Sequence, residues 1–401
     1  MSKEKLVLAF SGGLDTSYCA KYLSEEKDFE VYSVIVNTGG FDAEEVQEIE
    51  RKAYALGVRH HECIDVTDEY YAKCIKYMVF GNILKNDTYP LSVSSERVFQ
   101  AIATVEYAKK IGAGYIAHGS TGAGNDQVRF DLIFQIMMPS VKVITPIREM
   151  KLSREVEIEY LKSKGIEDNW VKKTYSINKG LWGTSIGGRE TLRSDTWLPN
   201  EAYPSQATRS GEEMLSIGFE KGELASVNGV AVTNPVSAIR QIEAIASAYA
   251  IGRDTHVGDT IIGIKGRVGF EAAAPLIIIK GHHLLEKHVL TKWQQYWKEQ
   301  LANWYGMLLH EGQYLEPVMR NIEKFLEDSQ LYVTGEVKIA LRPRQFEVLG
   351  ISSEHDLMNA KFAKYGEENT SFSGEDVIGF TKILSNQMKI YGAVNKEGFI
   401  C

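Results

Sequence analysis

The first 165 or so residues alternate short apolar runs, many of them β-branched, with segments whose apolar residues recur at helical spacing. The apolar runs predict strands over residues 6–10, 31–36, 59–66, 115–118 and 141–146. The helical spacing predicts helices over residues 16–25, 43–56, 68–80, 95–111 and 153–164. Short buried strands that alternate with helices are typical of a parallel sheet covered on both faces. Ligands bind such sheets at the carboxyl ends of the strands.

The pattern changes after about residue 170. Residues 170–193 are rich in Gly, Ser and Asn and predict an extended loop, whereas residues 214–233 predict a hairpin that turns at Asn228-Gly229. Residues 331–350 alternate like a second β pair, with Val337, Ile339 and Leu341 on one face. The helices predicted here cover residues 237–250 and 284–310. This mixture predicts an α+β second domain.

Two further apolar stripes lie in the second half of the chain. Trp293, Trp297 and Trp304 recur at helical spacing, which predicts a packed helix face. Near the C-terminus, residues 373–376 resemble a helix start. An apolar stripe then follows at Val377, Phe380, Leu384, Met388 and Tyr391. Such a terminal helix packs either on its own domain or on a neighbouring subunit, and periodicity does not decide between the two.

Composition and charge exclude several classes of protein. The chain has 401 residues, which favours two or more domains, and 44% of them are hydrophobic. A formal net charge of −8 disfavours nonspecific nucleic-acid binding. We expect no membrane span, because no apolar run approaches about 20 residues, and no signal peptide. Four widely spaced cysteines suggest neither a disulfide framework nor a zinc site, so we expect reduced thiols and a cytoplasmic protein.

A glycine-containing loop, Ala9-Phe-Ser-Gly-Gly-Leu-Asp-Thr-Ser17, leaves the first predicted strand and opens the first predicted helix. Glycines let the backbone turn sharply and approach a ligand closely, and a helix N-terminus attracts anions. The loop has no GK[ST] sequence, so it is not a Walker loop. It resembles the pyrophosphate loop of the N-type ATP pyrophosphatases, which cleave ATP between the α- and β-phosphates and adenylate a substrate oxygen. The alternative is a tight strand-to-helix turn without a ligand.

A second motif, His118-Gly-Ser-Thr-Gly-Ala-Gly-Asn-Asp-Gln-Val-Arg-Phe130, follows a short predicted strand. It predicts a flexible glycine loop that ends in Asn125, Asp126 and Arg129. Asn both donates and accepts hydrogen bonds, Asp accepts from an ammonium group, and Arg binds a carboxylate through two N–H groups. These groups suit a zwitterionic amino acid. The alternative is a solvated loop in which Asp126 and Arg129 pair with each other.

The two motifs in this order resemble the argininosuccinate synthase family, most strongly over residues 5–36 and 115–148. The resemblance implies an α/β fold, with a Rossmann-like parallel sheet of the adenine nucleotide alpha hydrolase kind, an α+β second domain and a C-terminal helix. It implies a nucleotide-binding domain over residues 1–168, a synthetase domain over 169–370 and an oligomerisation helix over 371–401. The implied reaction joins citrulline to aspartate through a citrullyl-adenylate, with ATP and Mg²⁺, in arginine biosynthesis. The implied assembly is a homotetramer.

The resemblance also implies roles for individual residues. The matches to ATP contacts are Ala9, Phe10, Ser11, Gly12, Gly13, Leu14, Asp15, Thr16, Ser17, Val36 and Gly119. The matches to aspartate contacts are Thr121, Asn125 and Asp126. The matches to citrulline contacts are Tyr89, Ser94, Asn125, Arg129, Ser176 and Ser185. Asn125, Asp126 and Arg129 are the candidate catalytic residues, with Asp126 holding the aspartate amine as a possible proton acceptor. Phosphates and water would hold Mg²⁺, so we expect no dedicated metal ligand.

The chain departs from the family pattern at four positions. Ala123 replaces a Lys, and Asp131 replaces a Glu, in the second motif. Gly258 and Phe270 stand where the family has a Glu and a Tyr that complete the citrulline pocket. We hypothesise that Asp259 replaces the missing Glu, which would require a bulge at Gly258 to turn its side chain.

Two alternative functions stay open at this point. One is another N-type ATP pyrophosphatase that adenylates a different amino acid or amide, although the Asn-Asp-Gln-Val-Arg sequence argues against it. The other is a nucleotide-binding regulatory homologue without turnover, which the changes at Gly258 and Phe270 keep open.

Overall fold

The computed structural model describes residues 3–166, 168, 175–361, 363, 365–366 and 369–395. The chain forms two compact units, Met1–Ser353 and Glu354–Cys401. The first unit contains the parallel-sheet segment and nearly all of the expected second domain, and the second unit contains the C-terminal tail.

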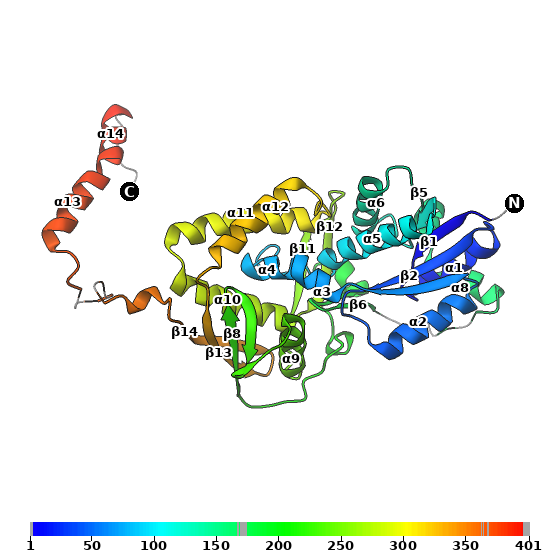
Figure 1. The fold of residues 1–401 in the computed structure, drawn as a ribbon, viewed down its shortest axis with the longest axis horizontal. Coiled ribbons are helices and arrows are strands. Elements are labelled where there is room, and N and C mark those ends of the chain that lie inside the picture. The colour runs from blue at the N-terminus through cyan, green and yellow to red at the C-terminus, as the bar shows by residue number, and fades with distance from the viewer. Residues whose placement is uncertain are drawn as a thin grey trace. The chain divides into compact units, whose positions relative to one another are not determined.

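A five-stranded parallel sheet forms the N-terminal part of the first unit, in the order β3-β2-β1-β4-β5 (Figure 1). Its strands are β1 (Lys5–Ala9), β2 (Glu30–Asn37), β3 (His60–Asp65), β4 (Tyr115–Ala117) and β5 (Lys142–Ile144). The helices between and after them are α1 (Leu14–Glu25), α2 (Ala43–Ala55), α3 (Thr67–Tyr70), α4 (Lys76–Phe80), α5 (Ser92–Ile111), α6 (Asp126–Met137), α7 (Pro146–Met150) and α8 (Arg154–Ser163). The predicted α/β fold with a parallel sheet is confirmed.

Apolar side chains on both faces of this sheet are buried. Leu6 and Leu8 belong to a core that also includes Leu23 of α1 and Leu161 of α8. Val7 points the other way, into a core shared with α5. Alternate residues of a strand face opposite sides, so helices cover the sheet on both faces, as the continuous apolar runs predicted.

The second motif is only partly a loop. Helix α6 begins at Asp126, so Asp126 and Arg129 lie in its first turn, three residues apart and on one side of the helix. The prediction of a flexible loop through Arg129 is therefore wrong for its last residues, because the apolar residues after Asn125 recur at helical spacing and pack against the sheet core.

An antiparallel sheet replaces the loop that we predicted for residues 170–193. Its order is β11-β12-β7-β6. Its strands are β6 (Ser176–Gly180), β7 (Gly183–Gly187), β11 (Arg253–Asp259) and β12 (Lys265–Glu271). Small residues form a tight hairpin here, with Gly183 at a φ of +110°. Residues 170–174 of the predicted loop lie outside the described residues.

A second antiparallel sheet has the order β10-β9-β8-β13-β14. Its strands are β8 (Glu213–Glu220), β9 (Glu223–Val227), β10 (Val230–Ala231), β13 (Gly335–Arg342) and β14 (Gln345–Ser352). The predicted hairpin is wrong in its turn, since the main reversal is at Lys221-Gly222 and Asn228-Gly229 makes a second turn before β10. The prediction for the last strand pair is confirmed, because Val337, Ile339 and Leu341 are all fully buried.

The helices of this region are α9 (Pro235–Ser247), α10 (Ala273–Val289), α11 (Lys292–His310) and α12 (Pro317–Ser329). The single helix predicted over 284–310 is broken, because Thr291 caps a new helix and shares a capping box with Gln294. The predicted tryptophan core face is wrong. Trp293, Trp297 and Trp304 are 58–63% exposed, and the opposite side of α11 is buried instead.

A buried ion pair fixes helix α11. The Lys298 ammonium lies 2.8 Å from Glu286 Oε2 of α10 and donates to the Phe80 carbonyl of α4. Gln330 donates to the other Glu286 oxygen at 2.8 Å. Burial alone would raise the pKa of Glu286, but the charge of Lys298 outweighs it and lowers that pKa. The pair therefore holds α11, whose last residue is His310, against two other helices.

The tail unit contains the helices α13 (Gly374–Leu384) and α14 (Asn386–Asn395). The predicted helix start is confirmed, because Ser373 caps α13 and forms a capping box with Asp376. Neither helix has a buried residue. Within its own unit, the apolar stripe from Val377 to Tyr391 is therefore exposed. No helix among the described residues is both long enough and apolar enough to cross a membrane.

We predict that Lys298→Ala lowers the free energy of unfolding by about 3–5 kcal/mol, because Glu286 would be left buried without its partner. Urea unfolding followed by circular dichroism measures the change. Lys292→Ala, at an exposed position of the same helix, is the matched control and should change stability by about 0.5 kcal/mol or less. Equal stability of the two variants would contradict a structural role for the pair.

Candidate functional site

The loop after β1 presents backbone N–H groups at the start of α1. Gly12 has a φ of +70°, a left-handed conformation that favours glycine, and Gly13 is the N-cap of the twelve-residue helix. Ser11 and Gly13 are exposed, and the Thr16 hydroxyl donates to the Gly13 carbonyl at 3.3 Å. Exposed N–H groups at a helix N-terminus form a site for an anion such as a phosphate chain.

The loop after β4 contacts the first turn of α1, directly after the loop that follows β1. A Cβ added at Gly119 would lie 3.2 Å from Cβ of Asp15 and 3.2 Å from Cγ2 of Thr16. Both distances are shorter than an ordinary contact, so glycine permits the close approach without displacing either neighbour. Strands β1 and β4 are parallel neighbours, and the chain leaves β1 for β2 on one side and reaches β4 on the other. This is the switch point at which parallel sheets bind ligands.

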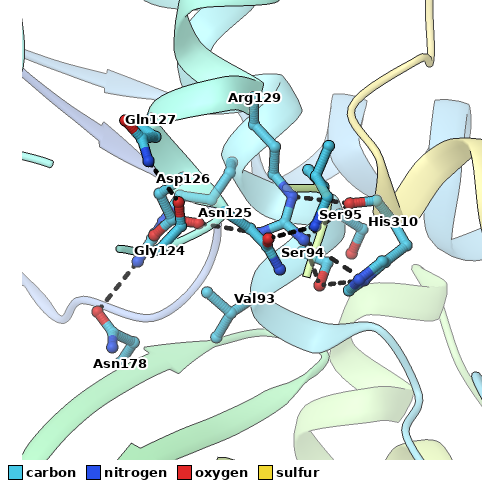
Figure 2. A network of polar contacts seen from close by, with 12 residues as sticks. Val93, Ser94, Ser95, Gly124, Asn125, Asp126, Gln127, Arg129, Asn178 and His310 are labelled. Carbon is cyan, nitrogen blue, oxygen red and sulfur yellow. Dashed lines mark hydrogen bonds and ion pairs between the residues drawn. The ribbon is translucent and has the colours of Figure 1, made fainter. Parts of the chain in front are cut away.

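A half-buried carboxylate between two arginines lies at the start of α6. Asp126 Oδ2 accepts from Arg97 Nε at 2.9 Å. Asp126 Oδ1 accepts from Arg129 Nη1 at 2.9 Å (Figure 2). Asp126 and Arg129 therefore do pair with each other, as the alternative prediction held. That prediction also placed the pair in a solvated loop, which is wrong for Arg129 because its side chain is buried.

This geometry argues against Asp126 as a proton acceptor. Burial alone would raise the pKa of its carboxyl, but the charges of Arg97 and Arg129 outweigh burial and lower the pKa. A carboxylate with a lowered pKa and both oxygens occupied binds a proton poorly. Asp126 is better suited to fixing the two guanidinium groups.

Arg129 connects three helices. Its Nε and Nη2 groups donate to the His310 carbonyl at the end of α11, at 2.9 and 2.7 Å. Nη2 also donates to Ser94 Oγ of α5 at 3.2 Å. Figure 2 shows the guanidinium between Asp126 on one side and Ser94 and His310 on the other. Because α5 begins at Ser92, earlier than predicted, Ser94 lies in the first turn of that helix.

One face of an antiparallel sheet lies next to this cluster, namely the sheet formed by β6, β7, β11 and β12. Residues directly opposite in antiparallel strands share a face, so Asn178, Ser185 and Phe270 lie together. Asn178 Oδ1 accepts from Arg97 Nη2 at 3.0 Å. Ser176 lies two residues before Asn178 on the same strand face but is exposed, whereas Ser185 is buried.

Tyr89 closes this face of the sheet. Its ring stacks on His256 at a centroid distance of 5.2 Å and contacts Phe270 at 5.4 Å. Both Tyr89 and Phe270 are buried. The structure thus brings together Tyr89, Ser94, Arg129 and Ser185, which the sequence predicted from distant segments.

The hypothesis for Asp259 does not agree with the geometry. Strands β11 and β12 pair in unbroken register, with Gly258 opposite Gly266 and Asp259 opposite Lys265, so the required bulge is absent. The exposed Asp259 carboxylate pairs with Lys265 at 2.8 Å. Its side chain is therefore on the other face of the sheet from Gly258, because strand residues alternate.

The remaining candidates lie along the edge of the parallel sheet. Asn125 Oδ1 accepts from the Ile261 N–H at 2.8 Å, which ties the second motif to the β11–β12 turn. Val36 is near the end of β2 and is buried. Thr121 lines a cavity of about 460 Å³. The other lining residues are Gly122, Ala123, Ile147, Arg148, Lys151 and Leu152.

A pair of carboxyl groups lies beneath the phosphate loop. The carboxyl group of Asp15 faces that of Glu157 of α8 closely enough for each to affect the pKa of the other. Burial raises the pKa of both groups, and the charge of Asp15 helps to raise the pKa of Glu157 to about 8. The pair therefore keeps a proton near neutral pH. Asp15 is the acidic side chain of the loop and a candidate to approach a phosphate-bound cation.

Sequence reasoning missed four polar residues of this cluster: Arg97, Asn178, His256 and His310. Helical spacing from Ser94 could have found Arg97, because residues three apart share a helix face. Periodicity gave no signal for the other three, since their partners are distant in the sequence.

We predict a pH-dependent effect of Glu157→Gln. Because the folded pKa of Glu157 is raised, its contribution to stability is present at low pH and is lost as pH rises toward about 8. The Gln variant stays neutral, so its melting temperature should fall less between about pH 5 and pH 8 than that of the unchanged protein. Thermal unfolding at several pH values measures this, and parallel curves would contradict the shared proton.

Two family models match this chain, the first over the parallel-sheet region and the second over the region that follows it. Residues 5–167 match the family model described as arginosuccinate synthase N-terminal HUP domain, and residues 175–391 match the arginosuccinate synthase C-terminal domain. The chain is 37% identical over 400 residues to the argininosuccinate synthase of Dictyoglomus turgidum, covering 98% of each. It is 36% identical over 391 residues to that of Methanocaldococcus jannaschii, covering 96% of this chain and 97% of the relative. Two matching domains and near-complete coverage show that this protein is a ligase of the argininosuccinate synthase family.

Proposed function

We propose that this protein joins a citrulline-type ureido substrate to aspartate and converts ATP to AMP and pyrophosphate, as a step of arginine biosynthesis. The contact of Gly119 with Asp15 and Thr16 is the observation that carries the proposal. It brings the phosphate loop next to the motif that contains Asn125 and Asp126. A nucleotide on the first loop and an amino acid on the second would then be neighbours.

In the first step, the ureido oxygen attacks the α-phosphorus of ATP, and the bond from that phosphorus to the bridging oxygen breaks. The product is a citrullyl-adenylate, and pyrophosphate leaves. The N–H groups of Ser11, Gly12 and Gly13 would stabilise charge on the departing phosphates. Mg²⁺, when bound, would supply further positive charge, with Asp15 as the nearest acidic side chain of the loop. The residues Ala9 to Ser17, Val36 and Gly119 would make up the nucleotide site.

In the second step, the aspartate amine attacks the activated ureido carbon, and AMP leaves with the former ureido oxygen. This step depends largely on holding the amine over the carbon. Thr121 and Asn125 would bind aspartate, with Arg148 and Lys151 supplying positive charge in the cavity beside Thr121. Asp126 would act by holding Arg97 and Arg129 in place, which fits its lowered pKa better than a role as base.

The ureido substrate would bind between α5 and the antiparallel sheet. Tyr89, Ser94, Arg129, Ser176 and Ser185 are the proposed contacts. Four of them converge on the buried cluster, which supports the assignment. Asp259 is not part of the proposed site, because its side chain pairs with Lys265 on the other face.

A cytoplasmic homotetramer completes the proposal. The tail helices α13 and α14 expose an apolar stripe, and α11 exposes Trp293, Trp297 and Trp304. Exposed apolar faces of this kind are typical of surfaces that another chain covers. Light scattering of the full chain and of a chain that ends before residue 371 tests this. A monomer in both cases would contradict the tetramer.

One assay tests the reaction itself. Pyrophosphate release from ATP is measured with aspartate alone, with the ureido substrate alone and with both. Continuous turnover that requires both supports the ligase, because the ureido substrate alone can release no more than the pyrophosphate of one adenylation per site. Nucleotide binding without release would support a regulatory protein that has lost turnover, and release with a different amide or acid would support another adenylating enzyme.

We predict that Arg129→Ala lowers kcat/KM for the ureido substrate at least about tenfold. A charge-assisted contact contributes about 1.5–3 kcal/mol, and the change also leaves Asp126 with one partner fewer. Steady-state pyrophosphate release measures the effect. Arg189→Ala is the control, because that side chain is 89% exposed. Near-normal kinetics for Arg129→Ala would refute the pocket.

We also predict that Gly12→Ala weakens ATP binding about tenfold. A non-glycine residue at a left-handed φ costs about 1–2 kcal/mol, and the added Cβ would lie 3.2 Å from Cγ1 of Ile49. Titration calorimetry with ATP measures the affinity. Gly114→Ala is the matched control, because nothing lies within 4 Å of the added Cβ and the position is not left-handed. Equal affinities would remove the loop from the nucleotide site.

A further inference from the structure

Two of the four departures from the family pattern, Gly258 and Phe270, lie on one face of one sheet. Gly258 and His256 are two residues apart on β11, and the register places Phe270 of β12 on the same face. Ser185 of β7 is directly opposite Phe270. Tyr89 covers this face through its contacts with His256 and Phe270. The altered positions therefore border the proposed ureido-substrate site.

An imidazole occupies the space beside Gly258. A Cβ added at Gly258 would lie 2.7 Å from His256 Nε2 and 3.3 Å from Asn86 Nδ2. A glutamate therefore does not fit at position 258 unless His256 moves. The carboxylate that the family pattern has there is replaced by a neutral ring, since burial and the charge of Lys85 lower the pKa of His256.

The charged groups that act on the two histidines of this face are positive, whereas the carboxylate on the same face, Asp254 opposite Phe270, is exposed. Arg129 and Lys85 are the charged groups that act on His310, and Lys85 also acts on His256. Asp126 has both oxygens occupied by arginines, and Asp259 pairs with Lys265 on the opposite face. An ammonium group bound beside His256 would meet like charges, and neither Asp126 nor Asp259 would be free to pair with it. Such a group is costly to bury unpaired.

Two buried ring nitrogens are available instead. His256 Nδ1 and His310 Nε2 have no hydrogen-bond partner among the described residues, although both side chains are buried. A neutral imidazole has one donor and one acceptor nitrogen. A secondary amide offers the complementary pair, an N–H and a carbonyl oxygen.

We propose that the site selects a ureido amino acid whose α-nitrogen is an uncharged, acylated amide, with His256 as the specificity-determining residue. This inference rests on the proposed ligase function and defines the substrate class of the same site. The adenylation and the attack by aspartate occur at the ureido end, so the acyl group takes no part in bond making.

The test compares two substrates in the pyrophosphate assay with ATP and aspartate. We expect kcat/KM for Nα-acetylcitrulline to exceed that for citrulline by about tenfold or more. Equal use of the two substrates, or a preference for citrulline, would overturn the inference and leave the ligase function intact. Release with neither compound would overturn both.

A variant pair tests the residues. In His256→Ala/Gly258→Glu, the space beside position 258 is freed and a carboxylate is introduced, so the preference should shift toward citrulline by about tenfold or more. Val257→Glu is the matched control, because this neighbouring side chain is 54% exposed on the opposite face. It should leave the ratio unchanged. A folding defect would lower both kcat/KM values together, whereas an unchanged ratio in the double variant, at equal melting temperature, would contradict the role of His256.

Discussion

The contact of Asp126 with Arg97 and Arg129 is the interaction on which the site depends. Arg129 is buried and the other two groups are partly buried, and a charge withdrawn from water needs its partners because an unpaired one costs several kcal/mol. Arg97 also donates a hydrogen bond to Asn178 of β6, and Arg129 donates to Ser94 and to the His310 carbonyl. The requirement to satisfy these groups fixes α5, α6, the end of α11 and the β6–β7 hairpin relative to one another.

A second constraint is the closeness of the loops after β1 and β4. A parallel sheet brings the carboxyl ends of adjacent strands to one edge, and the absence of a side chain at Gly119 lets the two loops touch. The phosphate loop is placed by the sheet, and the amino-acid motif is placed by the charge cluster. The two constraints together put the proposed phosphate loop and a polar, charged cluster side by side. This is the arrangement that a ligase needs, because it must activate one substrate with ATP and then present a second.

The departures at Gly258 and Phe270 are confined to one part of the molecule. They leave the nucleotide side of the molecule unchanged and alter only the face of the antiparallel sheet that Tyr89 covers. A change of substrate at the far end of the ureido compound is therefore compatible with unchanged chemistry at the α-phosphorus. The separation of the two regions in space is what permits this.

The sequence by itself determined the features that depend on near neighbours. Apart from α6 and α7, the strand and helix rhythm of the first 165 residues was predictable, as were the glycine turn at the start of α1 and the cap at Ser373, because each follows from periodicity or capping over a few residues. Only the tertiary structure decided which groups meet. Arg97 and Asp126 are 29 positions apart, and Arg129 and His310 are 181 apart. Strand register decided on which face of the sheet the Asp259 side chain lies. Trp293, Trp297 and Trp304 are exposed because the other side of α11 packs against the protein. A helical stripe is the same in sequence whether its own domain or another chain covers it, so periodicity carries no information about that choice.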